Sequence, residues 1–77
     1  MKPKLIIVWW VDACNGAGWE KLSRIKAEKL PVCCNAGFVV EDDEEKIILT
    51  NGFNDDEGIG FMAIPKGMVV KKKFVKY

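Results

Sequence analysis

The chain has 77 residues, of which 49% are hydrophobic and 30% are charged, and its net charge at neutral pH is +1. This composition is that of a globular protein and excludes a disordered one. The length fits a single domain over residues 1–77, near the lower size at which a chain folds unaided. The near-neutral charge provides no overall attraction to nucleic acid or to an anionic membrane.

The first predicted element is a strand over residues 4–11, which is rich in β-branched and aromatic residues. Its apolar run, Leu5 to Val11, is too short to span a bilayer, so no membrane association is expected. The run is apolar on both faces. Either it is the central strand of a closed sheet, or its second face is buried by another copy of the chain, which predicts a homo-oligomer formed through Leu5–Val11.

A loop and a short helix follow. Residues 12–18 (DACNGAG) have the chemistry of a loop, in which Asn15-Gly16 adopts positive φ at little cost. The helix is predicted over residues 19–29, because its apolar side chains fall on one arc, and Pro31 ends it. The residues of this arc are Trp19, Leu22, Ile25 and Leu30.

The second half of the chain has the pattern of a β-meander, in which short strands alternate with turns. Strands are predicted over residues 32–40, 46–50, 58–64 and 68–77, with a bend or bulge at Gly37. They are separated by the acidic run Glu41–Glu45, a polar loop and the turn Pro65-Lys66-Gly67. The predicted fold is mainly β (α+β): a small SH3-like or Sm-like antiparallel barrel of about five strands, with one short helix between the first and second strands.

Three segments carry a resemblance to a known group of proteins. They are VWWVDACNGAGW (residues 8–19), VCCNAGFVVEDDEEKIIL (residues 32–49) and AIPKGMVV (residues 63–70). They resemble short orphan proteins of tailed bacteriophages, which share a W-x-D…GW opening, a Gly-aromatic strand before an acidic hairpin, and a closing I-P-x-x-x-I. The resemblance implies a phage protein with an SH3-like fold, and it implies no mechanism. The cysteine content separately favours a reducing cytoplasm, here that of the host.

The residue content argues against an enzyme and against a resident cofactor. The chain has no histidine, and Ser23 is its only serine. Cys14, Cys33 and Cys34 do not form a disulfide framework, and we expect the latter two to be small buried side chains. The acidic residues Glu41–Glu45 lack the spacing of a calcium loop, and we interpret them as a solvated hairpin tip with no metal.

Two sets of residues are candidate sites. The first, Trp10, Asp12, Asn15, Gly16 and Trp19, combines indole rings, a carboxylate and loop amides that could hold a nucleotide or a peptide. The alternative is that both tryptophans belong to the core and that Asp12 or Asn15 caps the loop. The second set, Lys71, Lys72 and Lys73, could contact phosphates, with Phe74 and Tyr77 as stacking surfaces.

Two hypotheses for function follow. The first is a small, non-enzymatic phage protein that binds a host protein in the cytoplasm. The second is an oligomeric SH3-like or Sm-like barrel that binds a nucleotide or nucleic acid, as a sponge for signalling nucleotides or as an RNA binder.

Overall fold

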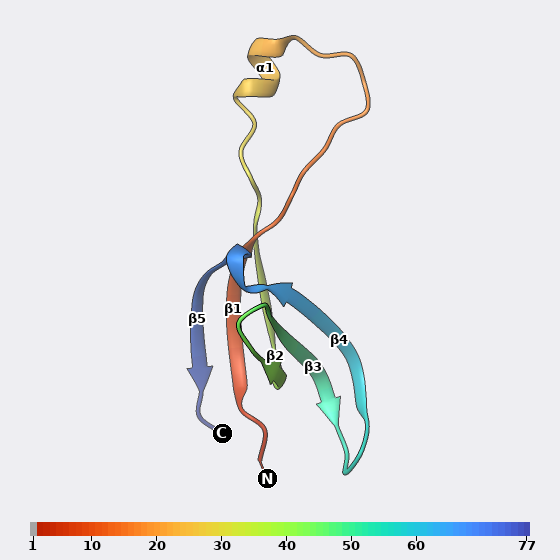
Figure 1. Cartoon of the computed structure of the whole chain (residues 1–77), viewed down its shortest axis with the longest axis vertical. Coiled ribbons are helices and arrows are strands. Elements are labelled where there is room, and N and C mark those ends of the chain that lie inside the picture. Colours follow the sequence, from red (N-terminus) through yellow and green to blue (C-terminus); the bar gives the residue numbers. More distant parts are fainter. Residues whose placement is uncertain (1) are drawn as a thin grey trace.

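The computed structural model describes residues 2–77 and shows one antiparallel sheet with a short helix (Figure 1). In chain order its elements are β1 (Leu5–Val11), α1 (Leu22–Lys26), β2 (Val32–Asp42), β3 (Lys46–Phe53), β4 (Gly58–Pro65), the 3-10 helix η1 (Lys66–Met68) and β5 (Val69–Val75). The mainly β class, the five antiparallel strands and the single short helix between the first two strands are confirmed. No helix among residues 2–77 has the length and hydropathy needed to cross a membrane.

The sheet curls but does not close. Its five strands lie in the order β4-β3-β2-β1-β5, so β4 and β5 are the two edges. A closed barrel would need hydrogen bonds between these edges. The chain instead turns through η1 after β4, and β5 then pairs along β1. The closure that we predicted is therefore not present in this sheet, and curvature alone brings its two halves together.

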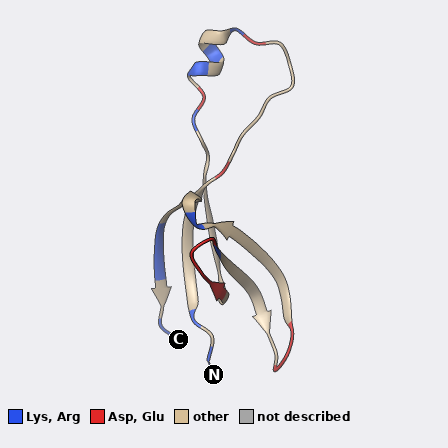
Figure 2. Cartoon of the chain, viewed as in Figure 1, with Lys and Arg blue, Asp and Glu red and all other residues tan. Residues whose placement is uncertain are grey.

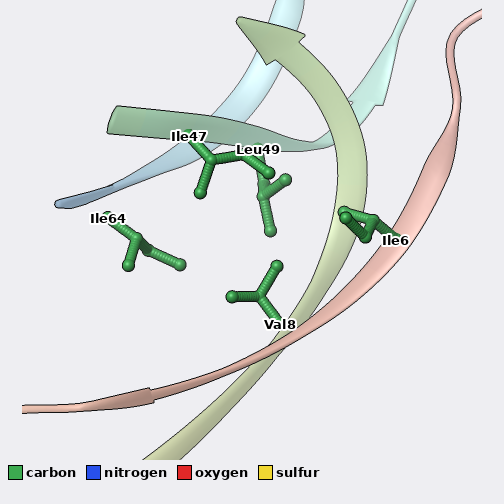
Figure 3. Close-up of a cluster of buried hydrophobic side chains, with 5 residues drawn as sticks. All are labelled: Ile6, Val8, Ile47, Leu49 and Ile64. Carbon is green, nitrogen blue, oxygen red and sulfur yellow. The ribbon is translucent and has the colours of Figure 1, made fainter. Parts of the chain in front are cut away.

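The core lies on the concave side of the sheet and is small (Figure 3). Its buried side chains come from β1, β3 and β4, and they are Ile6, Val8, Ile47, Leu49 and Ile64. In β1 and β3 they alternate with less buried residues, as the two-residue period of a strand requires. Each stabilises the folded chain by about 1.5–3 kcal/mol through burial. Only five residues supply this contribution, so the sheet has little surplus stability.

Strand β2 bends and joins the two halves of the sheet. Its first part pairs with β1 and its last part pairs with β3, and Phe38 belongs to both registers. The predicted bulge lies at Val40 rather than at Gly37, because the register with β3 shifts there. Gly37 is nevertheless constrained, since a Cβ atom at this position would lie 2.8 Å from the carbonyl oxygen of Thr50. At the bend, two backbones approach too closely for any larger residue.

The segment between β1 and β2, residues 12–31, projects from the sheet as an arm (Figure 1). At its base Val11 pairs with Val32, and the amide of Asp12 donates to the carbonyl of Pro31 at 3.0 Å. Strands β1 and β2 are thus a hairpin, and the arm is its loop. Most connections in compact domains have about 4–6 residues, so a hairpin loop of this length is unusual.

Helix α1 is shorter than the predicted helix over residues 19–29. It has no side-chain cap at its N-terminus, and none of its residues is buried. Trp19 lies outside it with a fully exposed side chain, and Leu22 is 75% exposed. The interpretation of Trp19 as a core residue is therefore wrong for this chain. Because no strand lies against the arm, the predicted apolar arc faces solvent.

Candidate functional site

The structure separates the residues of the predicted Trp10–Trp19 site. Trp10, the penultimate residue of β1, lies on the concave side, packs against the core, and donates from Nε1 to Oδ1 of Asn35 at 2.8 Å. Asp12 lies at the base of the arm, where its Oδ1 accepts from the amide of Ala13 at 2.8 Å. These two residues have local structural roles in the sheet and at its junction with the arm.

The other residues of this predicted site lie in the arm. Asn15 and Gly16 line a cavity of about 610 Å³ between the two legs of the arm, together with Arg24 and Leu30. The cavity does not include Trp19, whose ring points into solvent. Asn15 and Gly16, which are neighbours in the sequence, therefore share this cavity. Neither tryptophan lines it. Ligand binding at this loop stays a prediction.

The convex side of β1 carries an apolar surface that extends over three strands, and we call it the outer face. In β1, the side chains opposite to the core are half-buried, and their cross-strand neighbours in β2 and β5 share this side. Its members are Leu5, Ile7, Trp9, Val11, Val32, Cys34, Ala36, Phe38 and Val75. Among residues 2–77, β1 has extensive contacts only with β2 and β5, its two neighbours in the sheet. The sequence signal for this surface was the absence of alternation in β1.

The C-terminal lysines lie on two sides of the sheet. In β5, Lys71 pairs with Trp9 and Lys73 with Ile7, so both border the outer face, whereas Lys72 pairs with Val8 and points the other way. The ammonium group of Lys71 lies 5.1 Å from the centre of the Trp9 ring, which is a cation–π contact. Figure 2 shows this basic segment along β5. The three lysines do not form one phosphate-binding row.

The cysteines differ from the expected buried pair. Cys33 is half-buried, but Cys34 is exposed on the outer face opposite Trp9, and Cys14 is exposed in the arm. The prediction of burial is wrong for Cys34. It failed because neighbouring residues of a strand point to opposite sides, and the outer side is uncovered.

The acidic hairpin tip is held by ion pairs and hydrogen bonds. Oδ1 of Asp43 accepts from the amides of Glu45 and Lys46, each at 2.8 Å, and its Oδ2 lies 2.9 Å from Nζ of Lys46. The hydrogen bond from the Lys46 side chain and those from the two amides lower the pKa of Asp43 to about 2. Asp42 pairs with Lys66 of η1, whose hydrogen bond lowers the pKa of that carboxyl group.

These contacts tie the β2–β3 tip to the link between β4 and β5, and the amide of Lys66 also donates to the carbonyl of Glu45 at 2.8 Å. The run is exposed, as predicted, except for the half-buried Asp43, and within it Asp42 and Asp43 also pair with lysines. Among residues 2–77, no group of three His, Cys, Asp or Glu side chains is placed to hold a metal ion.

A second basic and aromatic cluster was missed from the sequence. The two chain ends meet around a cavity of about 410 Å³ that is lined by Lys2, Lys4, Lys76, Phe74 and Tyr77, among other residues. Nζ of Lys2 lies 3.9 Å from the Tyr77 ring centre, and Nζ of Lys4 lies 5.2 Å from that of Phe74. Only the pairing of β1 with β5 brings these lysines to the C-terminal aromatic residues, so no local sequence signal could reveal the cluster.

Comparison with known proteins found no matching family model, no matching curated protein and no matching solved structure. The function is therefore inferred from the geometry of the chain itself.

Proposed function

We propose that the chain is a non-enzymatic binding protein that acts by occupying a host protein in the cytoplasm of a phage-infected cell. The observation that supports this proposal is the outer face: an apolar surface over three strands, centred on Ile7 and Trp9, where β1 has extensive contacts only with its neighbours in the sheet. Apolar patches of this kind on small proteins are commonly interaction sites.

The border of the outer face indicates the chemistry of the partner. Lys71 and Lys73 flank the apolar centre along β5, and among the paired residues of β1, β2 and β5 they are the charged ones on the side of the outer face. An apolar centre with a charged rim is the usual anatomy of a protein interface. The complementary surface is an apolar patch with acidic residues along one side, because opposite charges steer association and set the orientation.

The test compares substitutions on this face with a matched substitution elsewhere. The tagged chain is expected to retain a stoichiometric protein from host lysate, Ile7→Glu to abolish this capture, and Lys71→Glu with Lys73→Glu to weaken it. Phe61→Ser removes an equally apolar but more exposed residue of β4 and should leave capture unchanged. Circular dichroism checks that each variant is folded. No stoichiometric partner, or equal capture by Ile7→Glu, would contradict the proposal.

A second candidate function is the binding of a nucleotide or nucleic acid by an SH3-like or Sm-like scaffold. The cavity at the chain ends favours it, because three lysines and two half-exposed aromatic rings line it without any acidic side chain. Stacking rings beside ammonium groups are the usual elements of single-strand binding.

This candidate predicts that a labelled single-stranded oligonucleotide binds with a strong salt dependence. Lys2→Ala with Lys4→Ala should weaken binding and reduce the salt slope. Binding that is unchanged in this double variant would remove the candidate.

A further inference from the structure

The chain exposes far more surface than a compact protein of its mass. Its accessible surface is 6412 Å², whereas a globular monomer of 8.7 kDa is expected to expose about 4,700 Å². Its radius of gyration is 16.1 Å, against about 11.5 Å for a compact chain of this length. The excess of about 1,700 Å² is roughly twice the area that one partner buries in an interface of standard size.

Much of this excess belongs to the arm, which has little to hold it in place. Residues 12–31 are all exposed, including the apolar side chains of Trp19, Leu22, Ile25 and Leu30. Beyond the hydrogen bond at its base, the bonds of the arm are internal to it: the backbone hydrogen bonds around α1, the ion pair between Arg24 and Glu28, and a long contact of 3.9 Å from Sγ of Cys14 to the carbonyl of Lys29.

A helix of five residues does not persist in water, because nucleation of so short a helix is unfavourable. The conformation of the arm is therefore stabilised only when another surface covers it. A partner that the chain meets only after folding would leave the arm uncovered until then.

We propose that the arm packs against a second copy of this chain. A second copy is present whenever the chain is made. Two copies that each covered the full excess would bury about 3,400 Å² in total, so covering most of it already reaches the range of about 2,000–5,000 Å² of obligate homodimers. The arm also has charges of both signs, as Figure 2 shows, and they include Glu20, Lys21, Lys26 and Glu28. Because the charges are mixed, like-charge repulsion does not prevent a symmetric contact between two identical arms.

This contact is separate from the outer face, so it does not depend on the proposed host partner. The two surfaces are also separated on the molecule, which extends 53 Å along its longest axis with the arm at one end (Figure 1).

Light scattering during size-exclusion chromatography tests the proposal. The wild-type chain is expected to elute as a dimer or a larger assembly, and Trp19→Ser with Leu22→Ser to elute as a monomer with an unchanged circular dichroism spectrum. The matched control is Ile59→Ser with Phe61→Ser, which removes two similarly exposed apolar residues of β4 and should keep the wild-type mass. A monomeric wild-type chain would overturn the proposal, as would a wild-type mass for the arm variant.

A second measurement covers the case in which the arm variant does not fold. The fluorescence of Trp19 alone is obtained as the difference between the wild-type chain and Trp19→Phe. We expect this difference spectrum to be blue-shifted when the protein is concentrated and to move towards the red upon dilution, because dissociation exposes the ring. A spectrum typical of an exposed indole at every concentration would overturn the proposal, whatever protein or nucleic acid the chain binds elsewhere.

Discussion

The sheet and the arm contain similar apolar residues but bury them to very different extents. In β1, Ile6 and Val8 are fully buried, whereas Leu22 and Ile25 of α1 remain largely exposed. The strands bury one face because β3 and β4 curl across from β1 and supply the opposite wall of the core. The arm is a single hairpin loop, and no other element of residues 2–77 packs extensively against it. The comparison shows that an apolar pattern specifies burial only where the topology provides a second surface.

The largest expected effect is the loss of a core side chain from the sheet. Ile64→Ala should lower the free energy of unfolding by about 2–5 kcal/mol, because it removes a fully buried side chain and leaves a cavity. Urea unfolding measures this change. Leu22→Ala in the arm, at a dilution at which the protein is monomeric, should cost less than about 0.5 kcal/mol, as exposed substitutions usually do. Equal losses at the two positions would break the contrast between sheet and arm.

A smaller effect is expected from two glycines, one in each region. Gly37→Ala places a Cβ atom 2.8 Å from a carbonyl oxygen of β3, so the strands must move apart, at a cost of about 1–3 kcal/mol. Gly18→Ala in the arm has no atom within 4 Å of the added Cβ and should be tolerated. Thermal unfolding of the two variants compares them directly. A more destabilising change at Gly18 would show that the arm is packed at that position.

The smallest effect concerns paired carboxylates. Asp43→Asn should lower the melting temperature at pH 7, since it weakens the bonds to Lys46 and to the turn amides. The folded pKa of Asp43, about 2, lies below its ordinary value of 3.8, so its stabilisation is present above pH 3.8 and is lost as the pH falls through about 2. The difference between wild type and variant should therefore shrink over this interval.

The matched control in the arm is Glu28→Gln, which breaks the exposed pair with Arg24. This substitution should change the melting temperature little at pH 7 and at pH 2, because exposed pairs contribute little to stability. A difference between wild type and Asp43→Asn that is the same at pH 7 and pH 2 would show that the Asp43 carboxylate does not stabilise the turn through its charge.

The strands could be predicted well and the helix poorly. Strands were expected at residues 46–50 and 58–64, and β3 and β4 begin at the expected positions and extend further. Alternation and turn residues determine such elements locally. The helix was expected over residues 19–29 from its apolar arc, but the arc stabilises a helix only when it is packed, and α1 retains residues 22–26 alone.

The candidate sites show the same limit. The sequence could identify the unusual composition of Leu5–Val11 and the basic C-terminal segment. It could not indicate that Lys71 lies against Trp9, or that Lys2 lies over Tyr77 at the other end of the chain. Both contacts arise from the pairing of β1 with β5, which are separated by almost the whole chain.

By itself, then, the sequence determined the mainly β class, the order of the elements and the positions of the turns, because strand periodicity and turn chemistry act over a few residues. Only the tertiary structure decided that the sheet stays open, that the second face of β1 is uncovered, and that residues 12–31 project as an arm. These features depend on which distant strands pair and on which surfaces then lack a neighbour. A local pattern has no information about either.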